Sequence, residues 1–210
     1  MLQIRAVEIK LLELFSQGKV RGTTHTCIGQ EAVAVGVIGV LDSSIDTVFS
    51  NHRGHGHFIA FTGNIKGFLA EVMGKSSAVC KGMGGSQHLH YGNFYGNGIQ
   101  GGVAGVATGI GMAQKLDKNN GVSVCFLGDG TFGEGLTYES MNMASLWKLP
   151  VLYIVEDNEI AQSTPMHLNR SGELIQRMKG FDIKAKELDG QDIEVVRHAT
   201  LDAISEIRGN

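Results

Sequence analysis

A three-layer α/β fold, with helices on both faces of a parallel sheet, is predicted by one stretch of the sequence. Residues 122–128 (VSVCFLG) form an apolar run, and residues 149–158 (LPVLYIVEDN) form a second one that ends in polar residues. Between them, residues 133–148 have the spacing of an amphipathic helix. Strand, helix and strand make a βαβ unit, and near-continuous apolar strands indicate a parallel sheet covered on both faces. Such sheets bind ligands at the carboxyl ends of their strands.

The remaining segments supply helices, one short strand and a glycine-rich loop. Helices are expected over residues 2–17, 29–41, 64–74, 103–116 and 191–207, and a strand over residues 46–50. The glycine spacing from Gly82 to Gly102 forbids a long regular element, so this stretch is expected to be a loop. The chain has 30 glycines and 2 prolines, which indicates backbone placed close to a ligand. Residues 1–210 are expected to form one domain.

The composition argues against several classes of function. Lys and Arg total 18 and Asp and Glu total 21, without a basic run, so nucleic acid is not an expected partner. No stretch approaches the about 20 apolar residues of a membrane span, and the N-terminal segment is amphipathic, unlike a signal peptide. We therefore expect a cytoplasmic protein. The three cysteines lack a CxxC spacing, which predicts reduced, packed thiols.

Two polar residues follow the two predicted strands of the βαβ unit. Asp129 and Asn158 each lie just past a strand end, so neighbouring strands would bring them to one crevice. A carboxylate and an amide oxygen are a partial ligand set for Mg²⁺, which takes its other ligands from phosphates and water. Gly128 and Gly130 allow the backbone to approach a phosphate near a helix N-terminus. Alone, this GDG tripeptide is more typical of a turn that Asp129 caps; Asn158 favours the magnesium and diphosphate interpretation.

Several motifs together resemble one protein family. GDG at 128–130, followed by Asn158, resembles the thiamine diphosphate signature. The α subunits of pyruvate, acetoin and branched-chain 2-oxo acid dehydrogenases are similar to six further segments: HTCIGQEA (25–32), NHRGHG (51–56), GMGGSQHLH (82–90), NFYGNGIQG (93–101), NMASLWKLP (142–150) and EDN (156–158). The resemblance extends from about residue 4 to 207. It implies the diphosphate-binding half of a thiamine diphosphate-binding fold.

The resemblance implies a role for each matching position. The implied Mg²⁺ ligands are Asp129, Asn158 and the backbone carbonyl of Ile160. The implied diphosphate contacts are the backbone amides of Gly130 and Thr131 and the guanidinium of Arg53. The implied aminopyrimidine contacts are the backbones of Gly98 and Gln100, and His25 matches a histidine that faces the reactive carbon of the cofactor. His52 is the second implied catalytic residue, although family members commonly have a tyrosine there.

The resemblance also implies an activity and partners. It implies oxidative decarboxylation of a 2-oxo acid with thiamine diphosphate and Mg²⁺, and acyl transfer to the lipoyl group of an acyltransferase. The GSQHLH segment is closer to the pyruvate and acetoin pattern, which favours a small, pyruvate-like substrate. A β subunit would supply the pyrimidine-side residues in an α2β2 assembly. Family α subunits continue past the position of Asn210, so a fragment, a split protein and a reduced relative remain open.

Other interpretations stay open beside this one. A transketolase-like half would share GDG and Asn158 but would transfer ketol units without a lipoyl partner, and a truncated relative would bind cofactor without catalysis. Histidines at 52, 55 and 57 suggest a zinc site, although the family pattern explains them without zinc. Glu31 is explained as an early helical residue, since the activating glutamate of two-chain members is a β-subunit residue. Core positions are predicted for Phe126, Phe132 and Trp147, and a close helix contact for the glycines from 101 to 109.

Overall fold

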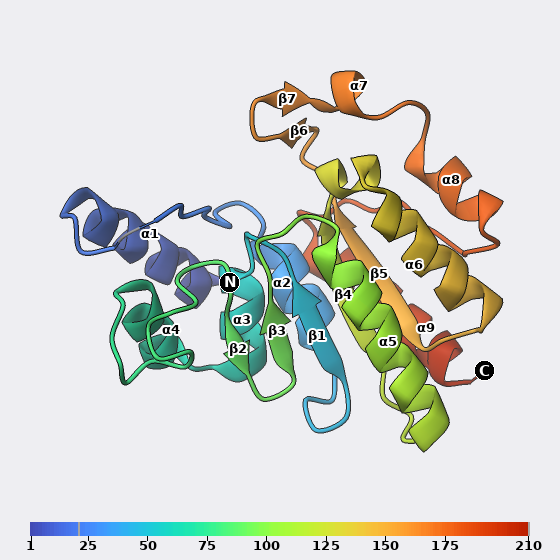
Figure 1. Ribbon diagram of the computed structural model, residues 1–210, viewed down its shortest axis with the longest axis horizontal. Helices are drawn as coiled ribbons and strands as arrows, with labels where there is room; N and C mark the ends of the chain where they lie inside the picture. The colour runs from blue at the N-terminus through green and yellow to red at the C-terminus, as the bar shows by residue number, and fades with distance from the viewer. Residues whose placement is uncertain (21, 210) are drawn as a thin grey trace.

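The computed structural model describes residues 1–20 and 22–209, which form a five-stranded sheet between two layers of helices (Figure 1). The sheet order is β2-β3-β1-β4-β5. The strands span His90–Tyr91 (β2), Phe94–Gly96 (β3), Thr47–Ser50 (β1), Ser123–Gly128 (β4) and Val151–Glu156 (β5). The pairs β3·β1, β1·β4 and β4·β5 are parallel, and only the short edge strand β2 is antiparallel among the described strands of this sheet. The predicted three-layer parallel architecture is confirmed.

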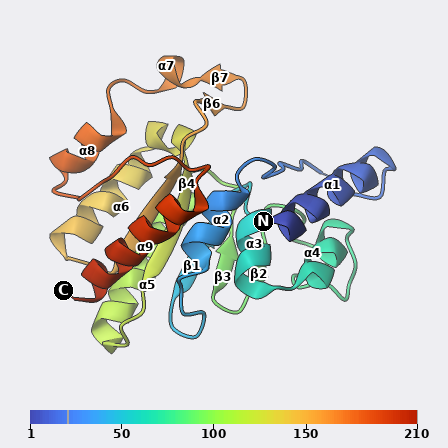
Figure 2. The ribbon, with the colours of Figure 1, turned by 180° about the vertical axis from the view of Figure 1, so that it is seen from behind.

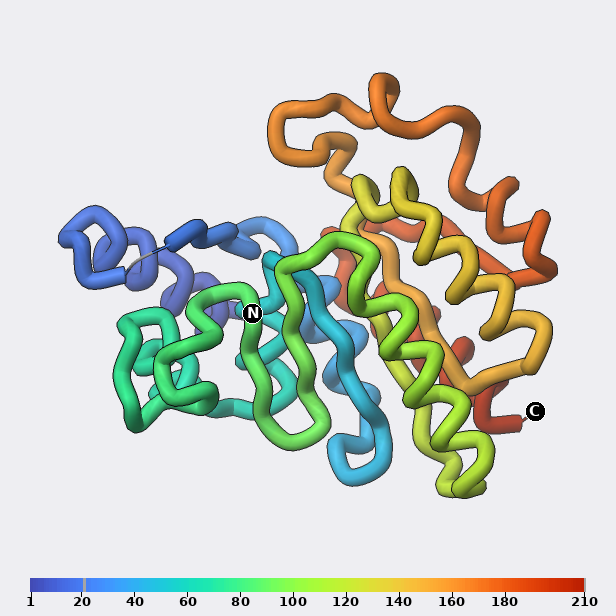
Figure 3. Tube along the Cα trace, viewed as in Figure 1, coloured from blue at the N-terminus to red at the C-terminus, as the bar shows by residue number. Residues whose placement is uncertain are grey.

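The helices divide between the two faces of the sheet. Figure 1 shows α5 (Gly102–Asp117) and α6 (Gly135–Leu146) in front of it. Figure 2 shows the opposite face, covered by α2 (Glu31–Ile38), α3 (His55–Thr62) and α9 (Ile193–Arg208). Beyond the β2 edge lie α1 (Leu2–Ser16) and α4 (Ile65–Val72), far from the C-terminal end of the chain, as the tube in Figure 3 shows.

The alternation of side chains along the central strands builds two cores. In β4, Val124 and Phe126 point into the core beneath α2, α3 and α9, whereas Cys125 and Leu127 point into the core beneath α5 and α6. All four side chains are buried, because successive residues of a strand face opposite sides of the sheet. This two-sided burial is the reason why the segment is apolar throughout. Strand β5 lies at the other edge and is half-buried.

The predicted loop from Gly82 to Gly102 contains two strands that the sequence analysis missed. Phe94 is fully buried and pairs in parallel register with Val48, while glycines lie at the ends of these strands. The glycines therefore limit the length of the strands rather than excluding them. Helix α3 was also missed, because its first turn, HGH, has neither a capping side chain nor a strong helix former.

A second missed region follows β5; its first part lies beyond the carboxyl ends of β4 and β5, and its last helix, α8, lies beside α6 (Figure 1). It contains β6 (Ile160–Ala161), β7 (Thr164–Pro165), α7 (Met166–Asn169) and α8 (Leu174–Gly180). The hairpin of β6 and β7 packs over the short 3₁₀ helix η1 (Asp129–Gly133). A Cβ atom on Gly130 would lie 2.8 Å from the Cβ of Ala161, so only glycine fits beneath this hairpin without movement.

Across residues 1–20 and 22–209, none of the helices combines the length and the apolar character that crossing a membrane requires.

Candidate functional site

The carboxyl ends of three neighbouring parallel strands form the candidate site. Ser50 ends β1, Gly128 ends β4 and Glu156 ends β5, and Gly128 is opposite Glu156 in the register of β4 and β5. The segments that follow carry most of the predicted site residues. The strands that precede Asp129 and Asn158, β4 and β5, are neighbours in the sheet, as the sequence interpretation of this pair required.

Gln100 joins two of the predicted residues in the centre of this edge. Its Nε2 donates to Nδ1 of His52, and its Oε1 accepts a hydrogen bond of 2.7 Å from Oγ1 of Thr131. A Cβ atom on Gly128 would lie 3.7 Å from Oε1 of Gln100 and 3.9 Å from Cε1 of His52. The structure thus brings four predicted residues from three segments together, with the backbone of Gly128 as the floor.

The histidines of this cluster favour the uncharged form. The rings of His25 and His52 meet edge to face with centroids 4.9 Å apart. Burial, reinforced by the neighbouring His25 and Arg53, lowers the pKa of His52 to about 4. Burial and the charge of Arg53 also lower the pKa of His25. A neutral His52 accepts at Nδ1 and keeps its hydrogen on Nε2, which agrees with the bond from Gln100.

Arg53 is the cation of the cluster. Its backbone amide donates to Oδ1 of Asn51 at 2.8 Å, and its Nη1 donates to the carbonyl of Thr26 at 2.9 Å. The second contact ties the guanidinium to the segment that carries His25. The positive charge of Arg53 disfavours protonation of both His25 and His52. The guanidinium is therefore the positive charge of this cluster, and the two rings beside it are neutral.

Asp129 is buried and only partly satisfied. Its Oδ1 accepts from the amide of Gly130 at 2.8 Å, whereas its Oδ2 is buried without a hydrogen-bond partner among the described residues. Burial raises the pKa of Asp129, and the adjacent carboxyl group of Asp157 raises it further. Oδ2 of Asp157 in turn lies 3.1 Å from Nη1 of Arg170. Two carboxyl groups and an unpartnered oxygen at a strand end make an environment that a cation would stabilise.

The other predicted residues lie at the margins of this cluster. Asn158 is exposed, and its Oδ1 accepts a hydrogen bond of 3.1 Å from the amide of Ile160, so both belong to one turn before the hairpin. Gly98 lies against the side chain of Gln87, whose Cβ is 3.0 Å from the position of an added Cβ. No hydrogen bond joins either position to Asp129 within the described part of the chain.

A buried layer of polar groups beneath the site was missed by the sequence analysis. Oε2 of Glu156 accepts from Nδ2 of Asn51 at 2.9 Å, and its Oε1 lies 3.3 Å from Nε2 of His57. Nδ1 of His57 lies 2.9 Å from Oγ of Ser50. Burial disfavours the charge of Glu156, but His57 and Asn51 outweigh it and hold its pKa below the usual value. Polar residues directly after an apolar strand, as in EDN, were the available signal.

The histidine-rich segment does not converge on a zinc-type centre. His55 contacts Glu8, His57 contacts Ser50 and Glu156, and His52 contacts Gln100. Within residues 1–20 and 22–209 there is no group of three or more His, Cys, Asp or Glu side chains placed to hold a metal ion. Each of the three histidines therefore has its own hydrogen-bond or ion-pair partners.

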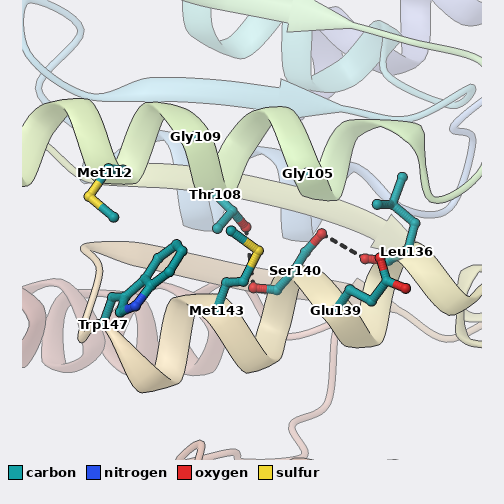
Figure 4. A pocket seen from close by; sticks show the side chains of 9 residues that line it. All are labelled: Gly105, Thr108, Gly109, Met112, Leu136, Glu139, Ser140, Met143 and Trp147. Carbon is teal, nitrogen blue, oxygen red and sulfur yellow. Dashed lines mark hydrogen bonds between the residues drawn. The ribbon is translucent and has the colours of Figure 1, made fainter.

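Two predictions outside the site need correction or refinement. Phe126 and Phe132 are buried as predicted, but the prediction for Trp147 is wrong, because its side chain is 42% exposed. Trp147 follows α6 and lines a groove of about 270 Å³ between α5 and α6 (Figure 4). Gly105 faces α6 there, with its added Cβ 3.7 Å from Cδ1 of Leu136.

Glu31 is a buried residue at the start of α2 that also binds Arg5 of α1, beyond its predicted role as an early helical residue.

Comparison with known proteins agrees with this geometry. A family model described as "Dehydrogenase E1 component" matches residues 1–208. The α subunit of acetoin:2,6-dichlorophenolindophenol oxidoreductase from Bacillus subtilis is 40% identical over 99% of this chain and 63% of its own length. Pyruvate dehydrogenase E1 component α subunits from Rhizobium meliloti and Zymomonas mobilis are 39% and 38% identical, over 99% and 97% of this chain and 61% and 59% of their own lengths.

The match is nearly complete for this chain and partial for its relatives. The chain spans about three fifths of the length of the curated relatives that it matches. The matched part contains the strand ends, the GDG turn and the buried layer beneath them. The chain therefore belongs to the dehydrogenase E1 component family.

Proposed function

We propose that this chain binds thiamine diphosphate and Mg²⁺ as the α half of a 2-oxo acid dehydrogenase's decarboxylating component. The observation that carries the proposal is the buried, unpartnered Oδ2 of Asp129 beside Asp157, at the carboxyl ends of β4 and β5. A divalent cation at this position would compensate both carboxyl groups. Family membership supports the same cofactor, because the dehydrogenase E1 component family is known to use thiamine diphosphate. The diphosphate of this cofactor is held through a metal ion.

The donor set fits a magnesium ion. Asp129 supplies a carboxylate oxygen, Asn158 an amide oxygen and Ile160 a backbone carbonyl, all from segments that follow neighbouring strands. Hard oxygen ligands of this kind suit Mg²⁺, whose remaining positions are taken by phosphate oxygens and water. Oδ1 of Asn158 accepts one hydrogen bond, from the amide of Ile160, and keeps a second lone pair for the metal ion.

The neighbouring backbone and Arg53 fit the diphosphate. Gly128 and Gly130 present backbone without side chains, and Thr131 extends this surface into η1. The amide of Gly130 donates to Oδ1 of Asp129 and leaves Oδ2 free for the metal ion, and we assign the amides of Gly130 and Thr131 to the phosphate oxygens. Arg53 supplies the charge, and its planar fork suits paired phosphate oxygens.

His25, His52 and Gln100 would shape the reacting end of the site. We assign the backbones of Gly98 and Gln100 to the aminopyrimidine and the two rings to the substrate side. Neutral rings can donate one hydrogen bond without adding charge beside Arg53. When bound, thiamine diphosphate supplies an electron sink for decarboxylation of a 2-oxo acid, and the protein supplies position and electrostatics.

The proposed substrate is a small, pyruvate-like 2-oxo acid, and the proposed acyl acceptor is a lipoyl group on an acyltransferase. The relatives above are named as α subunits of pyruvate dehydrogenase and of an acetoin oxidoreductase, which supports a β-type partner and an α2β2 assembly. Lipoyl reduction after mixing with a β-type partner and pyruvate would support this activity. Ketol transfer without lipoyl reduction would instead indicate a transketolase-like reaction.

Titration calorimetry of thiamine diphosphate with Mg²⁺ tests the cofactor proposal. Asp129→Asn removes the charge at nearly constant shape, and we expect affinity to fall by at least about tenfold, because the only anionic oxygen of the proposed ligand set becomes a neutral amide oxygen. Asp117→Asn, at the exposed end of α5, is the control and should bind like the wild type. Both variants are measured with and without a β-type partner. Absence of Mg²⁺-dependent binding to the wild type under both conditions would contradict the proposal.

A further inference from the structure

A buried polar cluster lies behind the candidate site and joins four separate segments. Oε1 of Glu8 in α1 accepts from Sγ of Cys27 at 3.2 Å and lies 2.7 Å from Nδ1 of His55, the first residue of α3. Nε2 of His55 lies 3.1 Å from the carbonyl oxygen of Ser86. All four residues are buried, and the Glu8 and His55 side chains are fully inaccessible to solvent.

The hydrogen bonds of His55 fix how protons are arranged in this cluster. The carbonyl of Ser86 can only accept, so Nε2 of His55 carries a hydrogen. Nδ1 of His55 and Oε1 of Glu8 then share the remaining proton between them. Cys27 donates to the same carboxyl oxygen, which leaves His55 and Cys27 both dependent on Glu8. Oε2 of Glu8 is buried without a hydrogen-bond partner among the described residues, so the carboxyl group is held through Oε1 by His55 and Cys27.

Two of the four segments also carry a residue of the candidate site, and a third carries a residue that contacts one. Cys27 follows His25 by two residues, and His55 follows Arg53 by two residues. Ser86 directly precedes Gln87, the residue that packs against Gly98. Oγ of Ser86 donates to the carbonyl of Thr23 at 2.9 Å, which joins two of these segments a second time. The cluster is therefore the buried junction behind three separate parts of the site.

Packing leaves little freedom at this junction. A Cβ atom on Gly56 would lie 3.0 Å from Sγ of Cys27, 3.3 Å from Cβ of Ala34 and 3.4 Å from Cγ2 of Ile4. The segment after His25 is thus held against α3 by close contact as well as by the bond to Glu8. The bond to Glu8 thus comes from a carboxyl group on α1, a helix that carries none of the candidate site residues.

We propose that Glu8 and His55 form a positioning pair that holds the His25 segment and the Ser86–Gln87 loop in place relative to Arg53. The expected effect of this pair on cofactor affinity rests on the proposed function. The positioning itself is a property of the free chain and can be measured without any ligand.

Residue-resolved amide hydrogen exchange of the free chain is the first arm of the test. The amide of Gln30 bonds to the carbonyl of Cys27, and the amide of His88 bonds to the carbonyl of Gly84, so these two report on the two segments. In Glu8→Gln we expect both to exchange at least about tenfold faster, because the added amide hydrogens disturb a buried network. Amides of β4 should keep their protection relative to the global stability of the variant.

Two further variants keep the test decisive if Glu8→Gln fails to fold. Cys27→Ala removes one bond to Glu8 and should accelerate exchange at Gln30 but not at His88. Ser86→Ala removes only the hydroxyl group bound to Thr23 and should accelerate exchange at both reporters by a smaller factor. Unchanged exchange in all three variants, or faster exchange only together with β4, would overturn the proposal.

Calorimetry with thiamine diphosphate and Mg²⁺ is the second arm. We expect Glu8→Gln to weaken binding by about tenfold, because the His25 segment and the Ser86–Gln87 loop are no longer held in place before the cofactor binds. Asp46→Asn is the matched control, since Asp46 is an equally buried carboxylate at the amino end of β1. It should lower thermal stability without changing affinity or exchange at the two reporters. If the wild type does not bind, the proposed function fails while the exchange arm still decides the positioning pair.

Discussion

At the scale of single residues, the site is defined by what its side chains lack. Oδ2 of Asp129 has no hydrogen-bond partner in the described structure, and His52 accepts a bond from Gln100 that excludes a proton on Nδ1. The first feature costs stability in the isolated chain, because a buried polar atom without a partner is unfavourable. Functional sites commonly retain such costs, since the missing partner is the ligand.

The depressed pKa of His52 predicts a specific loss of stability in acid. The pKa is about 4 in the folded chain, and an unfolded histidine titrates at about 6.5. Between these values the unfolded state binds more protons, so stability falls as the pH falls from about 6.5 towards 4. We expect His52→Gln to reduce the loss of unfolding free energy between pH 7 and pH 5 by about 1 kcal/mol, allowing for solvent screening of the half-buried ring.

Urea denaturation at the two pH values measures this difference. His198→Gln is the control, because it replaces an exposed histidine on α9, outside the candidate site. An NMR titration of the ring protons gives an independent reading, with His52 expected to titrate near pH 4. Equal pH dependence of the wild type and His52→Gln would show that this ring does not titrate as the geometry requires.

At the scale of elements, the sequence predicted most where a periodic pattern coincided with burial. The runs that became β4 and β5, and the helices α1, α5 and α9, were predicted to within a few residues. Strand β3 was missed because its one buried side chain, Phe94, is flanked by glycines. In the site, Asp129 and Asn158 were found because each follows a strand. Glu156 and Asn51 were not paired, because 105 residues separate them and only the sheet order makes them neighbours.

The glycine-rich loop is ordered by one carboxylate of α4. Glu71 is fully buried, and its two oxygens accept hydrogen bonds from four backbone amides of the loop: those of Cys80, Gly82, Gly84 and Gly85, at 2.7–3.2 Å. No sequence pattern predicts this arrangement, because the accepting carboxylate of Glu71 belongs to a helix and the donating backbone amides belong to a loop. It explains how a segment with little regular structure positions Ser86 and Gln87.

Replacing this carboxylate should therefore destabilise the chain. Glu71→Gln turns one of its oxygens into a donor, which leaves two of the loop amides without their acceptor. We expect the free energy of unfolding to fall by about 2–4 kcal/mol, measured by urea denaturation. Glu139→Gln, on the exposed surface of α6, is the matched control and should have little effect. A small effect of Glu71→Gln would mean that water reaches the loop amides.

At the scale of the whole molecule, the carboxyl and amino ends of the sheet differ in how their buried polar groups are paired. The carboxyl ends carry the candidate site with the unpartnered Oδ2 of Asp129, whereas the amino end of β1 is closed by a carboxylate with several partners. Asp46, just before β1, is completely buried and accepts from the amides of Asp42 and Val122, each at 2.8 Å. It also binds Nη2 of Arg208 through both oxygens, at 2.8 and 2.7 Å. This pair ties the last turn of α9 to the centre of the sheet.

The separation of the two ends predicts that stability and ligand binding can be changed independently. Arg208→Ala leaves the buried carboxylate of Asp46 with two amide donors and no cation, so we expect unfolding to become easier by about 2–3 kcal/mol. Lys10→Ala, which removes an exposed ion pair with Glu13, is the control and should change stability little. Under conditions where both variants remain folded, thiamine diphosphate affinity should match that of the wild type. Loss of affinity in Arg208→Ala alone would mean that α9 transmits strain along β1 and β4 to the site, and the two ends would then act as one unit.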